Sequence, residues 1–240
     1  MFFKERKFGG DPNIYYYRKG SAASQLTEEE ISDAWFKDAR HLHVTGITPA
    51  LGLSTQNSIR VVMRKAREKG LTVSFDPNLR RKIWTELEAR ETLLSLVPLC
   101  DLFLPGIEEA EFLLGSNTVE ALGSEFLKMG PKVVAIKLGS EGSIAFTSEG
   151  KVSAAPYPVS RVVNSVGAGD AFAAGFLSVL FEAVEKICAP FETSLERLQI
   201  ALDRGNLMGS LATQFRGDWE GLPKLAELEQ IYSGIQFITR

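Results

Sequence analysis

Cysteine and histidine are scarce in this sequence, with two of each among 240 residues. Cys100 and Cys188 both lie among apolar neighbours, so we interpret them as reduced thiols in the core and expect a cytoplasmic protein. His41 and His43 alternate along a predicted strand, and no Cys/His cluster accompanies them. This pattern argues against a metal site of the zinc type.

Long apolar runs and an excess of positive charge are also missing. No stretch approaches the ~18 apolar residues of a membrane-spanning helix, and no secretory signal opens the chain. The formal net charge of -3 argues against a broad nucleic-acid-binding surface. We therefore expect neither a nucleic-acid nor a membrane partner. Because no repeat, low-complexity segment or break in composition occurs, we expect one globular domain over residues 1–240.

From about residue 41 the sequence alternates between strand-like and helical segments. The predicted strands are 42–47, 71–76, 101–105 and 132–139, with short strands in 143–157, and the predicted helices are one ending at Gly70, then 86–97, 108–115, 119–130, 170–187, 194–214 and 223–232. This alternation predicts right-handed crossovers onto a mostly parallel sheet that is covered on both faces. The fold class is therefore α/β, with an α/β core over 41–240 and a flap or lid over 1–25.

Polar side chains follow several of the predicted strands. They are Asp76, Asn78, Arg80, Glu109 and Lys137. In sheets of this kind ligands bind beyond the carboxyl ends of the strands, so we expect these residues to share one rim.

The run "VNSVGAGDAFAAGF" (Val163–Phe176) joins a glycine-containing loop to an apolar helix. Its glycines let backbone N–H groups turn toward an anion, and the helix N-terminus adds its positive dipole end. Asp170 could then accept a proton beside a bound phosphate, although the run alone is also typical of an ordinary aspartate N-cap. Its glycine spacing matches neither a Walker loop nor a dinucleotide-binding fingerprint.

This run resembles the second signature of the ribokinase-like (PfkB) sugar kinases. Three further segments resemble that family in the expected order, namely "FDPNLR", "LPGIEEAEFLLG" and "IKLGSEGS". The resemblance covers nearly the whole chain and implies a three-layer α/β/α fold that uses ATP and Mg²⁺. It also implies an anion hole formed by Gly167, Ala168 and Gly169, with Asp170 as the catalytic base.

The resemblance implies roles for other residues as well. Glu109 would organise water and Mg²⁺. The nucleotide would be bordered by Lys137, Gly139, Ser140, Gly142, Gly167 and Gly169. Asn206 would lie near the adenine, although it can equally be an ordinary polar residue of a helix. The family usually has Asp where Asn164 stands and Asn where Gly106 stands, which puts metal handling in doubt.

On the substrate side, "YYYRKGSAAS", "HVTGITPALG" and "FDPNLRRKIW" resemble the 2-keto-3-deoxygluconate kinases within this family. The resemblance implies that Tyr16 and Arg18 contact the acid end of the sugar, that Arg80 supports it, and that Asp170 meets the terminal hydroxyl. Guanidinium groups suit this task because they bind carboxylates in a two-pronged way. Tyr16 can instead be a core aromatic and Arg18 a solvated charge.

Members of this family begin with a longer N-terminal part, which includes strands of the central sheet and a Gly-Gly motif. We interpret "KFGGDPN" as a hairpin turn rather than that motif. The chain is then either a fragment of a full kinase or a shortened, non-catalytic member that binds a ligand. A kinase of the fructokinase or 5-dehydro-2-deoxygluconokinase type is a further alternative. We also expect a homo-oligomer, with residues 8–24 as one possible contact.

Overall fold

The computed structural model describes residues 2–5, 13–182, 193–217, 219 and 221–232. Its central sheet has six strands in the order β3-β4-β5-β6-β7-β8. Their bounds are β3 His41–Thr45, β4 Thr72–Asp76, β5 Leu102–Phe103, β6 Val133–Lys137, β7 Ser143–Thr147 and β8 Gly150–Ala154. The first four strands are parallel, whereas β7 and β8 return antiparallel. The predicted, mostly parallel sheet is confirmed.

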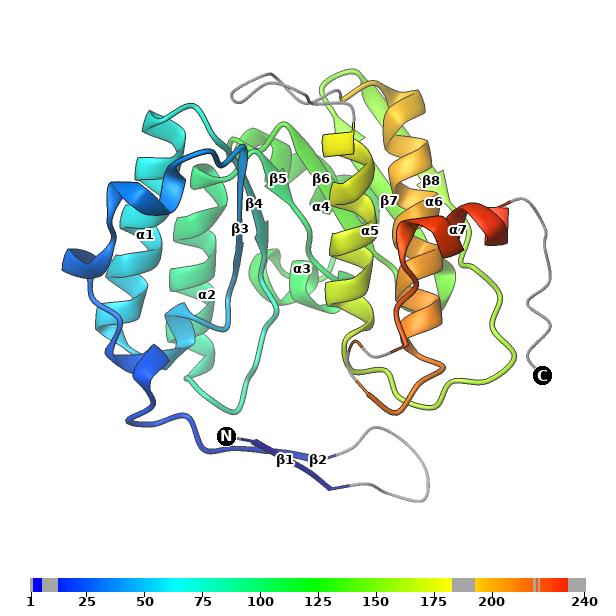
Figure 1. The fold of residues 1–240 in the computed structure, drawn as a ribbon. Coiled ribbons are helices and arrows are strands. Elements are labelled where there is room, and N and C mark those ends of the chain that lie inside the picture. The colour runs from blue at the N-terminus through cyan, green and yellow to red at the C-terminus, as the bar shows by residue number, and fades with distance from the viewer. Residues whose placement is uncertain (1, 6–12, 183–192, 218, 220, 233–240) are drawn as a thin grey trace.

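Helices cover both faces of the sheet, which gives the three layers seen in Figure 1. On one face lie α1 (Leu53–Glu68), α2 (Glu86–Leu96), α3 (Ile107–Leu114) and α4 (Val119–Lys128). On the other lie α5 (Ala168–Glu182) and α6 (Leu195–Ala212), with α7 (Leu225–Tyr232) packed outside them. Short 3₁₀ helices occupy Ala22–Gln25, Glu28–Glu30, Asp33–Phe36, Pro49–Leu51, Val97–Leu99 and Gly139–Glu141.

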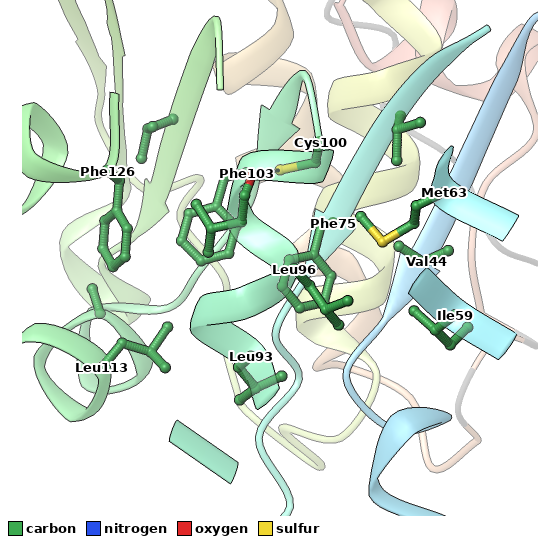
Figure 2. Packing of buried hydrophobic residues seen from close by; sticks show 14 of the residues in the cluster. Val44, Ile59, Met63, Phe75, Leu93, Leu96, Cys100, Phe103, Leu113 and Phe126 are labelled. Atoms are coloured by element: carbon green, nitrogen blue, oxygen red, sulfur yellow. Dashed lines mark hydrogen bonds between the residues drawn. The ribbon is translucent and has the colours of Figure 1, made fainter. Parts of the chain in front are cut away.

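The larger core cluster lies between the sheet and α1 to α4 (Figure 2). Phe75 of β4, Phe103 of β5 and Phe126 of α4 are fully buried in it, with ring centroids 5.6 and 4.8 Å apart along the row. Such aromatic pairs contribute about 0.5–1.5 kcal/mol each beyond the burial of their surface. The row fixes the two central strands against the helical layer.

Helices α5 and α6 cross closely because glycines lie at the crossing. A Cβ on Gly175 would stand 2.8 Å from the carbonyl oxygen of Arg204, and a Cβ on Gly205 would stand 2.8 Å from the ring of Phe172. The absence of these methyl groups lets the two backbones approach. Gly209 of α6 also lies against the start of α5, since a Cβ there would stand 3.1 Å from the carbonyl oxygen of Ala168.

A two-stranded antiparallel lid lies beside the sheet, formed by β1 (Phe2–Glu5) and β2 (Asn13–Tyr16). In Figure 1 it lies below the strands, at the end where α5 begins. Lys82, in the loop after β4, donates a hydrogen bond from Nζ to the carbonyl oxygen of Ile14 at 3.3 Å and so joins lid and core. Most of the predicted hairpin turn, residues 7–12, lies outside the described residues.

Cys100 is buried as a free thiol, as predicted, and its Sγ lies 3.2 Å from the carbonyl oxygen of Val97. Burial raises the pKa of this thiol, which keeps it protonated. Cys188 lies outside the described residues. Across those residues, no helix is long and apolar enough to cross a membrane.

Candidate active site

The polar residues that follow the strands share one cavity, as the sequence predicted. This cavity has a volume of about 460 Å³, and its lining includes Asp76, Asn78, Arg80, Glu109 and Lys137. The start of α5 closes it from the other side with Gly167, Gly169 and Asp170. The parallel register brings these residues together because β4, β5 and β6 end at the same edge.

Asp170 lies in the first turn of α5 and faces this cavity. Its Oδ1 accepts a hydrogen bond from Nδ2 of Asn78 at 3.1 Å. Desolvation raises the pKa of Asp170 above its ordinary value, and the charge of Asp76 raises it further. The positive charges of Lys137 and Arg80 oppose this increase. A carboxylate with a raised pKa is a stronger base, which suits proton abstraction near neutral pH.

Asp76 and Lys137 form an ion pair at the floor of the cavity, with 2.6 Å between Oδ2 and Nζ. Both side chains are largely buried, at 3% and 16% exposure. Burial alone would lower the pKa of Lys137, but the charges of Asp76 and Glu109 outweigh it and raise the pKa. Lys137 is therefore held as an ammonium ion.

Asn78 adopts a left-handed backbone conformation, with φ at 38°. Asparagine tolerates this region better than most residues. Its backbone N–H donates to Oδ1 of Asp76 at 3.0 Å, which closes a tight turn directly after β4. This turn places the side-chain amide of Asn78 against Asp170, 92 residues further along the chain.

Glu109, in the first turn of α3, joins the loops that follow β4 and β5. Oε1 accepts from the backbone N–H of Leu79 at 2.7 Å and Oε2 from that of Gly106 at 2.8 Å. Burial raises the pKa of Glu109, and the positive charge of Lys137 counters this. Glu109 thus has a clear structural role, and its predicted role toward Mg²⁺ stays a prediction.

The loop before α5 has the backbone that an anion hole requires. Gly167 has φ at 90°, a conformation that favours glycine. Within the described residues, no backbone carbonyl accepts from the N–H groups of Gly169 and Asp170. These groups belong to the first turn of a helix, where N–H groups lack intrahelical partners and the dipole attracts negative charge.

A second, more apolar cavity of about 510 Å³ lies on the far side of this loop. Of the predicted nucleotide residues, Lys137, Gly139, Ser140, Gly142, Gly169 and Asn206 line it, as does Ala168. Gly167 lines the first cavity instead. At position 142 only glycine fits, because a Cβ would stand 2.1 Å from the carbonyl oxygen of Ala154. The cavity size is in the usual range for ligands such as nucleotides.

Asn206, on α6, is buried and its amide is already engaged. Nδ2 donates to the carbonyl oxygens of Ala154 and Ala155 at 3.1 and 2.9 Å, so its two N–H groups hold the segment after β8. Only Oδ1 is left to accept a hydrogen bond from a ligand. Both readings of this residue therefore have support, as a structural tie and as part of the cavity lining.

Three residues line both cavities, namely Lys137, Ser165 and Gly169. A group that passes from a ligand in one cavity to a ligand in the other would pass beside them. Lys137 Nζ also lies close to the start of α5, 3.6 Å from the point where a Cβ of Gly169 would stand. The arrangement is suited to moving an anionic group between two bound molecules.

On the substrate side, Tyr16 and Ile14 of the lid line the first cavity, whereas Tyr15 and Tyr17 are exposed. The alternation predicted for the tyrosines is therefore present. Arg18 is half-buried and stacks on the ring of Tyr16 at 4.8 Å, but it is not part of the cavity lining.

Sequence reasoning did not select Arg81 and Lys82, which line the first cavity beside Arg80. Arg81 pairs with Glu86 at 2.9 Å and Lys82 with the lid. Within the described part of the chain, the guanidinium of Arg80 has no hydrogen bond or ion pair, whereas its backbone carbonyl accepts from the N–H of Ile83 at 3.1 Å. The basic run Arg80–Lys82 in the sequence could have identified them as candidates.

The two departures from the expected pattern have local consequences. A Cβ on Gly106 would stand 3.5 Å from Oε2 of Glu109, so the fold has room for the side chain that the family usually carries there. Asn164 Oδ1 accepts from the backbone N–H of Val166 at 3.2 Å and stabilises the loop before α5. Among the described residues, no group of three or more His, Cys, Asp or Glu could hold a metal ion.

Comparisons with known proteins found relatives that cover nearly the whole chain. The 2-dehydro-3-deoxygluconokinase of Bacillus subtilis is 40% identical over 236 residues, which are 97% of this chain and 68% of that protein. A 5-dehydro-2-deoxygluconokinase of Listeria monocytogenes is 29% identical over 235 residues, with 96% and 68% covered.

Solved structures show the same fold. A PfkB protein from Polaromonas sp. JS666 has a TM-score of 0.80 and 37% identity, covering 95% of this chain and 69% of that one. A candidate ribokinase II from E. coli, in complex with ATP and Mg²⁺, has a TM-score of 0.79 and 25% identity, with 93% and 68% covered. Residues 3–225 match the family model for pfkB family carbohydrate kinases. The chain therefore belongs to the pfkB family of carbohydrate kinases.

Proposed function

We propose that this chain transfers the γ-phosphoryl group of ATP to the terminal hydroxyl (O6) of 2-keto-3-deoxygluconate. The observation that carries this proposal is the first cavity, which Asp170 and Arg80 both line and in which the guanidinium of Arg80 has no hydrogen-bond or ion-pair partner among the described residues. A sugar acid has a hydroxyl at one end and a carboxylate at the other. It can therefore place its hydroxyl at Asp170 and its carboxylate near Arg80.

In the proposed reaction, ATP occupies the apolar second cavity with its phosphates toward Gly169 and Lys137. Asp170 accepts the proton of the O6 hydroxyl while that oxygen forms a bond to the γ-phosphorus. The bond between the γ-phosphorus and the oxygen that bridges it to the β-phosphate breaks, and ADP leaves. The N–H groups of the α5 start stabilise charge on the moving phosphoryl group.

The described residues fit a magnesium ion that arrives with the nucleotide. Mg²⁺ usually keeps several waters and binds through one or two carboxylates together with substrate phosphates. Glu109 is the residue that would hold it, through water, because it lies at the cavity wall. When bound, the ion would neutralise phosphate charge.

The decisive experiment is a coupled ADP-release assay on this chain with four acceptors, namely 2-keto-3-deoxygluconate, 5-keto-2-deoxygluconate, fructose and ribose. We expect the highest kcat/KM for the first acceptor and a product phosphorylated at O6 by NMR. A higher kcat/KM for fructose or ribose would contradict the sugar-acid assignment.

Arg80→Met tests the acid-binding role separately. Loss of a charge-assisted contact should raise KM for the sugar acid by about ten- to a hundredfold while KM for ATP changes little. Arg90→Met is the matched control, because Arg90 stacks on Phe112 at 5.1 Å and does not line the cavity. Equal changes in both KM values, or no change, would contradict the role of Arg80.

A second candidate is phosphorylation of 5-keto-2-deoxygluconate, favoured by the relative from Listeria monocytogenes. Both compounds are sugar acids, so Asp170 and Arg80 would act alike on either. The acceptor comparison above separates them. If nucleotide binds but none of the four acceptors is phosphorylated, the chain is instead the non-catalytic ligand binder that the sequence left open.

A further inference from the structure

Asp76 contacts Lys137 directly and Asp170 through Asn78. Its Oδ2 holds Nζ of Lys137 at 2.6 Å. Its Oδ1 accepts the backbone N–H of Asn78, whose side chain donates to Asp170. One carboxylate therefore uses its two oxygens to position an ammonium group and, through Asn78, the carboxylate assigned as the base.

The ion pair between Asp76 and Lys137 lies where the two cavities meet. Lys137 lines both cavities and its ammonium group lies beside the backbone of Gly169. A group passing from one cavity to the other would pass this ammonium. A phosphoryl group in transfer carries negative charge on its three equatorial oxygens, which a fixed cation stabilises.

We propose that Lys137 is a catalytic residue that contacts the phosphoryl group in transfer, and that Asp76 is the positioning residue that aligns Lys137 with Asp170. This inference rests on the proposed phosphoryl transfer and adds to it the groups that define the path between the two cavities. The ion pair with Asp76 fixes the ammonium at the boundary between the two cavities, which is the preorganised placement that stabilises developing charge.

The acidic groups around the ammonium support this arrangement. Besides Asp76 of β4, the carboxylates of Glu109 on α3 and Asp170 on α5 act on Lys137. Arg80 also acts on Asp170, so two cations stand against these three carboxylates. A free phosphate would meet repulsion there unless Lys137 and the α5 N–H groups faced it, which the geometry provides.

Nucleotide binding tests the contact without any acceptor. Calorimetry should show that Lys137→Met weakens binding of ATP about tenfold and binding of ADP less than about twofold, because only ATP has the γ-phosphate. Equal weakening of both nucleotides, or none, would refute the contact. Since no sugar is present, this result is independent of which acceptor the enzyme uses.

A double-mutant cycle tests the positioning role of Asp76. Asp76→Asn keeps an oxygen for Asn78 but loses the charge that holds Lys137. We expect kcat to fall by about ten- to a hundredfold with KM for the acceptor nearly unchanged, as for an interaction made in the transition state. Adding Asp76→Asn to Lys137→Met should cause little further loss, whereas multiplied losses would show that Asp76 acts by another route.

Asp101→Asn is the matched control. Asp101 is also buried, accepts the backbone N–H of Val73 at 2.9 Å and lies 3.6 Å from Lys132, at the opposite end of β4. It should lower thermal stability without changing kcat. If the parent chain phosphorylates none of the four acceptors but the ATP and ADP effects of Lys137→Met differ as expected, the proposed substrate fails while the γ-phosphate contact stands.

Discussion

Replacing Asp170 by asparagine isolates the proposed base from its structural role. The substitution conserves size, and the new side-chain oxygen can still accept from Nδ2 of Asn78, which lies 3.1 Å from Oδ1. The pKa of Asp170 is raised in the folded chain, so its ionised form is disfavoured there relative to the unfolded chain. Near neutral pH, Asp170→Asn should therefore leave the melting temperature unchanged or slightly higher.

The expected loss of activity follows from the task of the residue. General-base catalysis contributes about 10²- to 10⁴-fold in rate, which corresponds to roughly 3–5.5 kcal/mol of barrier. We expect kcat in the coupled ADP-release assay to fall by that factor. The KM for ATP should change little, because the N–H groups and Lys137 that we propose to contact the phosphates remain.

The pH dependence provides an independent readout. A protonated Asp170 cannot accept the hydroxyl proton, so kcat/KM of the parent should fall on the acid side. The midpoint should lie above the ordinary value of 3.8, because the folded-state pKa is raised. Asp170→Asn should abolish this acid limb. Arg80→Met should move it to higher pH, because the charge of Arg80 lowers the pKa of Asp170.

A kcat within tenfold of the parent, with the acid limb still present, would refute the assignment of Asp170 as base. The matched control is Glu182→Gln at the other end of α5, where the carboxylate lies 3.7 and 3.6 Å from Arg197 and Arg204. This variant should keep its turnover and its pH profile. A comparable loss in the control would show that charge on α5, rather than proton transfer, determines the rate.

Two further predictions concern stability. Gly175→Ala should lower the melting temperature by several degrees in calorimetry, because overpacking against the carbonyl oxygen of Arg204 costs about 1–3 kcal/mol and exceeds the gain of about 1 kcal/mol in helix propensity. An unchanged or higher melting temperature would contradict the close crossing of α5 and α6. Burial lowers the pKa of His41 to about 3, so between pH 6.5 and 3 the unfolded chain binds a proton that the folded chain does not. Urea unfolding should therefore show stability falling by up to about 1.4 kcal/mol per pH unit as the pH decreases below 6.5. The decline should be shallower in His41→Gln, and an equal decline would contradict the lowered pKa of His41.

Much of the fold could be predicted because it depends on local periodicity. The strand ending at Asp76 and the helix over 86–97 both have strong local patterns, and the structure has β4 and α2 there. The end of the helix predicted over 170–187 lies in part outside the described residues. The 3₁₀ helices between 22 and 51 were not predicted, because short turns of this kind have no periodic signal.

The sequence predicted which residues make up the site, but not which of them contact one another. Strand ends placed Asp76, Asn78 and Lys137 at one rim, yet nothing local in the sequence pairs Asp76 with a lysine 61 residues away. The hydrogen bond from Asn78 to Asp170 depends on a left-handed turn, which the sequence only permits. Arg18 shows the opposite case, because its spacing from Tyr16 placed it on the correct face but could not show that it stacks on that ring instead of lining the cavity.

Consecutive residues of β4 serve different parts of the molecule. Phe75 belongs to the buried aromatic row, and Asp76, pointing to the opposite face, holds Lys137. If β4 slipped by one residue against β3 or β5, the phenylalanine and the aspartate would exchange faces, and the hydrophobic core and the site would be lost together. Completing the core and assembling the site are thus one cooperative folding event. A compact intermediate with mispaired β4 should accordingly be inactive. Recovery of activity during refolding should coincide with burial of the aromatic row.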